Sequence, residues 1–146
     1  MPDARSVQLA ALILRVSMGV MLIAHSLYLK LFIFTLAGTA AFFQSIGLPG
    51  ALAYVVFALE AVGGIMLVLG IQSRLVSLVM VPILAGATWA HWGNGWMFGY
   101  PNGGWEYPLY LTVLAGVQVL LGDGAWALKP SQPLAIGGAS ESPRTA

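Results

Sequence analysis

Long apolar stretches separated by short polar breaks are the main pattern along this chain. Four of them come close to the length of roughly 20 residues that a helix needs to cross a hydrocarbon core about 30 Å thick. Clusters of Gly, Pro, Asn and Ser lie between them, as is typical of loops. The pattern therefore predicts an all-α integral membrane four-helix bundle. Its spans are expected at residues 7–28, 51–70, 75–92 and 107–128.

The segment 30–47 follows this pattern less well. It starts with Lys30 and a short apolar run, which Gly38, Thr39 and Gln44 then interrupt. The apolar part is too short for a fifth span, so we expect an interfacial or re-entrant segment after the first helix. The sequence leaves open which of the two it is.

The composition supports a membrane location. Hydrophobic residues make up 59% of the 146 residues and charged residues 8%, whereas soluble domains carry about 25% charged residues. A surface this apolar must face the lipid bilayer. The net charge of +1 and the lack of a basic stripe exclude nucleic acid as a partner. The chain has no cysteine, which excludes disulfides, thiolate metal sites and cysteine nucleophiles.

The flanking charges predict the orientation of the spans. Four spans place both termini and the loop at residues 71–74 on one side, and the opposite side carries only Lys30. By the positive-inside rule, both termini are expected in the cytoplasm. We expect one transmembrane domain over 1–129 and a disordered cytoplasmic tail over 130–146, which is rich in Pro, Ser, Gly and Ala. The basic residues on the terminal side are Arg5, Arg74, Lys129 and Arg144.

Three polar residues are expected at one depth inside the membrane. Counting along the helices places Arg15, Glu60 and Gln118 at a similar level. A charge near the membrane centre costs about 2.5–3.5 kcal/mol, so such residues usually pair. We therefore predict a buried Arg15–Glu60 pair with Gln118 as a hydrogen-bond partner, while Asp123 competes for Arg15. This pair could fix the register of the helices, or it could transfer a proton or bind a ligand.

A second polar group is expected at the outer interface. His25, Lys30, His91 and Glu106 all lie at helix ends on that side. Together they could hold a polar head group and pass a proton, and a quinone would suit them because its carbonyls accept from His or Lys. The alternative is that each residue has an ordinary interfacial role. Lys30 would extend its ammonium group to the membrane surface, Glu106 would be stabilised by a helix N-terminus, and the tryptophans would anchor the protein in the interface. The surrounding aromatic residues are Trp89, Trp92, Trp96, Trp105, Tyr100 and Tyr107.

The sequence predicts no metal site and no catalytic apparatus of its own. His25 and His91 have no third ligand, and haem ligation by them is an alternative with little support. Hydrolase, Walker and dinucleotide motifs are absent from the sequence. Several glycines in the spans are expected to allow close helix packing. They are Gly63, Gly64, Gly70 and Gly116.

Several short motifs follow one another along the chain. They are Leu14-Arg15 with Gly19, His25 and Lys30; Gly47-Leu48-Pro49; Leu59-Glu60 with Gly63-Gly64; Leu69-Gly70 with Arg74; Gly104-Trp105-Glu106-Tyr107-Pro108; and Gly122-Asp123-Gly124. In this order, and spread over residues 10–128, they resemble the DoxX family of small bacterial membrane proteins. The sequence departs from the family pattern at Ser26, where many members have glycine, and after Asp123, where the usual ending with an aspartate is missing.

The resemblance implies a four-helix protein of the bacterial inner membrane that is often a subunit rather than a complete enzyme. The family takes its name from a subunit of a thiosulfate:quinone oxidoreductase. Arg15, Lys30, Glu60 and Glu106 match the polar pattern of the family.

Three hypotheses of function follow from the residues and the resemblance together. The first is a membrane subunit of a quinone-linked redox system, which binds a quinone itself or anchors a redox partner protein that does. The second is a non-enzymatic scaffold or assembly factor that docks partners on its aromatic loop. The third is a small transporter, which would require a homo-oligomer because four helices leave little room for a pathway.

Overall fold

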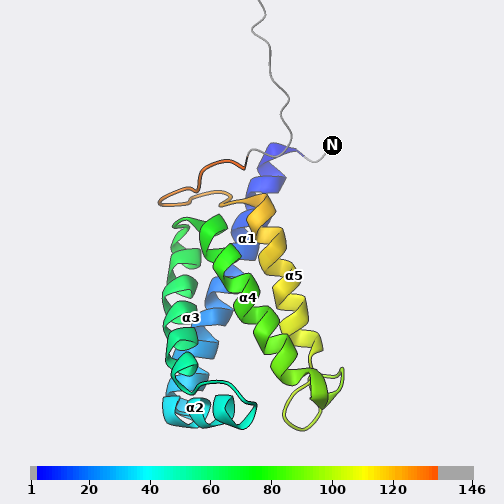
Figure 1. Cartoon of the computed structure of the whole chain (residues 1–146). Coiled ribbons are helices and arrows are strands. Elements are labelled where there is room, and N and C mark those ends of the chain that lie inside the picture. Colours follow the sequence, from blue (N-terminus) through cyan, green and yellow to red (C-terminus); the bar gives the residue numbers. More distant parts are fainter. Residues whose placement is uncertain (1–2, 135–146) are drawn as a thin grey trace, which may run out of the picture.

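The computed structural model describes residues 3–134, and these residues are helical with no β-strand (Figure 1). The prediction of an all-α fold is therefore confirmed. The helices are α1 (Ala4–Ile23), η1 (Ala24–Ile33), α2 (Leu36–Ser45), α3 (Ala51–Leu69), α4 (Ser73–His91), η2 (Trp92–Asn94) and α5 (Glu106–Leu121).

The long helices run side by side, and α2 lies across one end of them (Figure 1). Three helical stretches of the described chain are long and apolar enough to cross a membrane, namely Ala4–Ile33, Ala51–Leu69 and Ser73–Asn94. They match three of the four predicted spans. The helix α5 is also apolar but has only 16 residues. It packs along α4, and α1 packs along α3.

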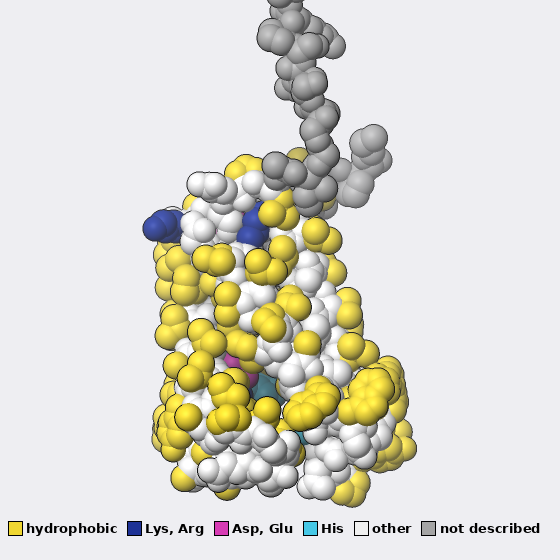
Figure 2. Space-filling view, viewed as in Figure 1, with side chains coloured by type: hydrophobic (Ala, Val, Ile, Leu, Met, Phe, Trp, Pro, Cys, Tyr) yellow, Lys and Arg dark blue, Asp and Glu magenta, His cyan; other side chains and the backbone are white. Residues whose placement is uncertain are grey.

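The bundle carries apolar side chains on the outside as well as in the core. Met18, Leu22 and Met80 are almost fully buried between the helices. Large apolar side chains such as Ile13 and Leu120 are more than 60% exposed on the outer faces. Figure 2 shows hydrophobic side chains over most of the visible face, with Lys and Arg near the end where α1 begins. An apolar exterior of this kind is suited to lipid.

The first helix continues past its predicted end at residue 28 and changes type. Residues 24–33 form a π-helix, in which the N–H of Phe34 still bonds to the carbonyl of Leu29, five residues earlier. Lys30 thus belongs to the first helical stretch. The rest of the segment expected to be interfacial or re-entrant contains α2, which begins after Thr35. The Thr35 hydroxyl oxygen accepts from the N–H of Gly38 at 3.0 Å and caps α2.

Close glycine contacts join α1 to α3. A Cβ at Gly19 would lie 2.7 Å from the carbonyl oxygen of Gly64, and one at Gly64 would lie 2.8 Å from that of Gly19. Gly63 and Gly70 also have near neighbours, so the packing prediction is confirmed for the glycines of α3 and its C-cap. It is wrong for Gly116, where a Cβ would meet open space.

The chain after α5 folds back over the end of the bundle where α1 begins. The N–H of Ala125 bonds to the carbonyl of Gln8, and Ile71 forms a bridge with Lys129. Ordered contacts continue past the predicted boundary at 129, because the Ser131 hydroxyl accepts from the N–H of Arg74 at 3.1 Å. Residues 135–146 of the predicted tail lie outside the described part of the chain.

Candidate functional site

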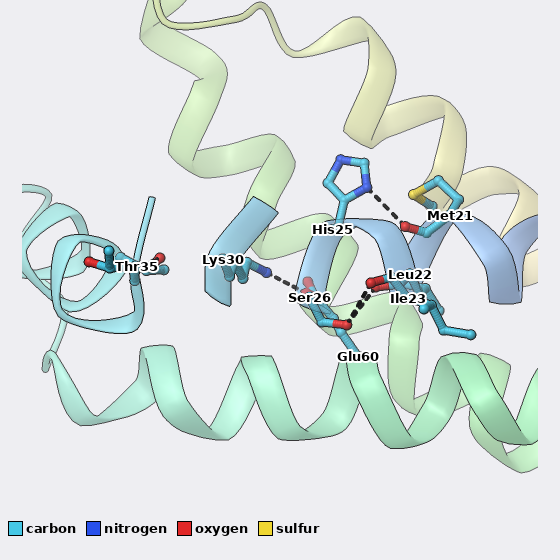
Figure 3. Close-up of polar contacts among 9 residues, drawn as sticks. Met21, Leu22, Ile23, His25, Ser26, Lys30, Thr35 and Glu60 are labelled. Atoms are coloured by element: carbon cyan, nitrogen blue, oxygen red, sulfur yellow. Dashed lines mark hydrogen bonds and ion pairs between the residues drawn. The ribbon is translucent and has the colours of Figure 1, made fainter. Parts of the chain in front are cut away.

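An ion pair between Lys30 and Glu60 lies inside the bundle. Lys30 comes from η1 and Glu60 from the middle of α3, and the ammonium group donates to the carboxylate (Figure 3). The side chains are 17% and 8% exposed, so both charges are largely removed from the surroundings. It is the one ion pair within residues 3–134. Because lone charges are costly in a membrane, each of these groups stabilises the other.

This pairing corrects the predicted Arg15–Glu60 pair. Arg15 is 1% exposed, and its guanidinium donates to four backbone carbonyls instead of a carboxylate. Two of these carbonyls lie at the C-terminal end of α3, where helix carbonyls lack the usual donor four residues later in the helix. The other two lie in the segment after α5. The acceptors are Leu67 at 2.9 Å, Val68 at 2.9 Å, Asp123 at 2.7 Å and Ala125 at 2.8 Å.

Asp123 and Gln118 also have structural partners. Arg15 reaches the backbone carbonyl of Asp123, while the carboxylate accepts from the N–H groups of Ser73 at 2.9 Å and Ser131 at 2.8 Å. Burial raises the pKa of Asp123, but these hydrogen bonds outweigh it and hold the pKa below the ordinary value of 3.8. Gln118 donates to the carbonyl of Gly122. Neither residue contacts Glu60, so the predicted intramembrane cluster is divided.

His25 lies on the same π-helix as Lys30. Its Nδ1 is 3.0 Å from the carbonyl oxygen of Met21, which can only accept, so Nδ1 carries the proton. In the neutral ring, Nε2 is then left as a proton acceptor. The ring stacks on Tyr107 of α5, with 5.8 Å between centroids. Figure 3 shows Lys30 directed at Glu60 and the His25 ring directed away from α3.

A recess opens on the apolar face of the bundle. Figure 2 shows acidic and histidine side chains within it, between hydrophobic side chains over the lower halves of α3 and α4. A molecule dissolved in the lipid could therefore reach ionisable side chains from this face.

His91 holds the loop that leads to α5. Its Nδ1 lies 3.1 Å from the carbonyl oxygen of Asn102, and its ring stacks on Phe42 of α2. Asn94 donates to the carbonyls of Asn102 and Gly103. These contacts close the loop on itself, and they account for His91 without a ligand.

Glu106 borders an aromatic hollow at the start of α5. Its Oε1 accepts from the N–H of Phe98 at 2.8 Å. Trp105 lies outside the lining and supports Trp96, with 4.6 Å between centroids and near-perpendicular rings. The hollow has a volume of about 680 Å³, and its lining residues are Trp96, Phe98, Glu106, Tyr107 and Tyr110.

The predicted outer cluster therefore separates into three parts. Lys30 joins Glu60 inside the bundle, with His25 on the same π-helix. Glu106 borders the hollow, and His91 and Trp105 support the loop. Tyr107 links the first two parts, because it lines the hollow and stacks on His25. Sequence reasoning missed the Lys30–Glu60 pair and the lining role of Phe98 and Tyr110.

The fold and the buried ion pair define a helical membrane protein. The chain belongs to the DoxX family, whose model matches residues 10–92. It is similar to a protein of Bacillus subtilis (strain 168) named "Putative oxidoreductase CatD", with 36% identity over 83 residues. The match covers 57% of this chain and 60% of that protein. No solved structure matches the chain at a significant level.

Proposed function

We propose that this chain is a membrane subunit of a quinone-linked redox system and that the quinone head group binds at the Lys30–Glu60 pair. The observation that carries the proposal is a largely buried ion pair inside a bundle whose outer faces are apolar. Ionisable residues inside a membrane usually mark a functional site, because their burial is costly. The name of the similar Bacillus subtilis protein, an oxidoreductase, agrees with redox chemistry.

The chemistry of the residues fits a quinone. Glu60 uses one of the three N–H donors of the Lys30 ammonium, which leaves donors for a quinone carbonyl. The free Nε2 of His25 can take a proton from a hydroxyl of the reduced form. When bound, the quinone supplies the electron transfer, and a partner protein exchanges those electrons. This chain binds the head group and handles protons.

In this proposal, α1 with η1, α3, α4 and α5 all cross the inner membrane. The helix α5 would be the fourth span, since it packs along the whole of α4 in an antiparallel direction (Figure 1). The helix α2 would lie in the outer interface. Arg5, Arg74 and Lys129 belong to the end of the bundle where α1 begins, and by the positive-inside rule this distribution supports a cytoplasmic location for that end in our proposal.

The test is mass spectrometry of small molecules recovered with the chain after gentle extraction from its native membrane. We expect about one quinone per chain, and a loss of at least roughly tenfold in Lys30→Met, which removes the donor. Lys129→Met is the matched control because Lys129 is exposed in the segment after α5. It should retain the quinone.

Other results would contradict the proposal. A preparation without quinone that also fails to bind added quinone would exclude it. A stable protein partner recovered under those conditions would favour the scaffold hypothesis. Retention of quinone in Lys30→Met would place the binding site elsewhere on the chain.

A further inference from the structure

The aromatic hollow at the start of α5 has chemistry that differs from that of the Lys30–Glu60 pair. Ring faces and edges make up most of its lining, and Glu106 is its single charged residue. A quinone carbonyl is an acceptor, so an ionised carboxylate would repel it. The same carboxylate would attract a cation.

We propose that this hollow binds an organic ammonium group. Aromatic rings attract cations through the negative potential of their faces, with the cation about 6 Å or less from the ring centre. Phe98 and Tyr107 lie 5.4 Å apart at 60° to each other and form two walls. Trp96 supplies a third wall and is held by Trp105, which in turn stacks on Trp92 at 4.5 Å. These contacts keep the walls in place before a ligand arrives.

Glu106 supplies the charge for this site. The N–H of Phe98 bonds to Oε1, and Glu106 has no ion-pair partner among residues 3–134. Oε2 is thus available to an ammonium group. The side chain is partly buried, which strengthens its attraction for a cation relative to a fully solvated carboxylate.

The hollow also has the right position for an amine at a membrane surface. It lies where the loop 92–105 meets α5, at the end of the bundle opposite to the start of α1 (Figure 1). Tyr110 is 61% exposed, which leaves the hollow open on the outside. The ammonium group could belong to a lipid such as phosphatidylethanolamine or to a free amine. Either source presents the same chemistry to the site.

The experiment titrates the chain in a maltoside detergent with choline and follows tryptophan fluorescence. We expect saturable binding of choline. The neutral isostere of choline, 3,3-dimethylbutan-1-ol, should bind roughly tenfold more weakly, because it has the same shape without the charge. Equal binding of the two compounds, or no binding of choline, would overturn the proposal.

Variants locate the site. Glu106→Gln keeps an acceptor for the N–H of Phe98 but removes the charge, and should weaken choline binding roughly tenfold. Tyr110→Leu should also weaken it, whereas the exposed Tyr54 lies outside the lining, so Tyr54→Leu should have no effect. Unchanged binding in both Glu106→Gln and Tyr110→Leu would contradict the assignment.

Two further experiments identify the source of the amine and distinguish this site from the proposed quinone site. Displacement of choline by phosphatidylethanolamine vesicles, and not by phosphatidylglycerol vesicles, would indicate a lipid head group. Displacement by neither would indicate a free amine. Lys30→Met should leave choline binding unchanged, so the two sites can fail independently.

Discussion

At the level of single residues, the sequence reveals which polar groups are buried but not which of them meet. The depth of Arg15 and Glu60 follows from counting along apolar spans, and both are buried as expected. Their partners depend on how each helix is rotated, which hydropathy does not determine. Arg15 donates to the carbonyls of Leu67 and Val68 at the end of α3, and Lys30 reaches Glu60 from the next turns of the first helix.

Arg15 is expected to need its planar group of donors. Arg15→Lys keeps the positive charge, but an ammonium group has only three N–H donors. It lacks the planar set of donors with which the guanidinium reaches four carbonyls. Hydrogen bonds to charged groups contribute about 1.5–3 kcal/mol each, so we expect a loss of about 2–4 kcal/mol in the free energy of unfolding. Titration with SDS in mixed micelles measures it, and Arg5→Lys is the exposed control. Equal stability of both variants would contradict the role of Arg15.

Lys30 and Glu60 should be coupled in stability. Removing one partner leaves a buried charge unpaired, which typically costs about 3–5 kcal/mol. We therefore expect Lys30→Met and Glu60→Gln each to destabilise the protein, and the double variant to lose much less than the sum. The same SDS titration provides the three values of a double-mutant cycle. Additive losses would show that the two groups do not interact.

Asp123 should make the fold sensitive to acid. The pKa of Asp123 is lowered in the folded state, so the ionised carboxylate stabilises the fold at pH values above the ordinary pKa of 3.8. This stabilisation is lost as the pH falls through the lowered pKa of the folded state. Thermal unfolding between pH 7 and pH 2 should show this loss. Asp123→Asn should be less stable at pH 7 and should have a weaker dependence on pH below about 4. An unchanged acid dependence would exclude Asp123 as its source.

At the level of elements, the sequence predicts most of the helices but misses the π-helix. The apolar stretches locate α1, α3, α4 and α5, because length and hydropathy decide whether a helix can span a membrane. The π-helix is invisible to such counting, since it changes only the hydrogen-bond spacing. It contains both His25 and Lys30. π-Helical turns often occur at functional sites.

The crossing of α1 and α3 should tolerate no side chain at its glycines. A methyl group in Gly64→Ala would lie 2.8 Å from the carbonyl oxygen of Gly19, and backbone cannot move aside cheaply. We expect a loss of about 1–3 kcal/mol in the free energy of unfolding. Gly116→Ala is the control in α5. It meets open space and should be neutral or stabilising by up to about 1 kcal/mol. Similar values for the two variants would contradict this packing.

At the level of the whole molecule, the sequence predicts a helical bundle with an apolar exterior, and its motifs indicate the family. Residues 122–128 were expected to continue the fourth span, and a disordered tail was expected to begin at residue 130. The helix α5 instead ends at Leu121, and the described segment after it closes that end of the bundle through Arg15, Asp123 and the bridge from Ile71 to Lys129. These contacts join residues about 50 to 110 positions apart, so no local pattern could reveal them.

The position of the candidate sites also depends on the whole bundle. The Lys30–Glu60 pair joins the first helical stretch to α3, and the hollow forms where a loop folds back on α5. Their separate chemistry follows from where the charges end up. Lys30 is paired and lies inside the bundle, whereas Glu106 has no ion-pair partner among the described residues and lies at the edge of the aromatic hollow.

The most direct test of the proposed quinone site is the amount of quinone recovered with the double variant Lys30→Met/Glu60→Gln. This variant removes both charges together, so the fold no longer has to bury one of them alone. We expect a folded protein that has lost its quinone, while the wild-type chain retains about one per chain. A folded double variant that still carries quinone in the wild-type amount would contradict the proposal, and would leave the ion pair with a role in helix register alone.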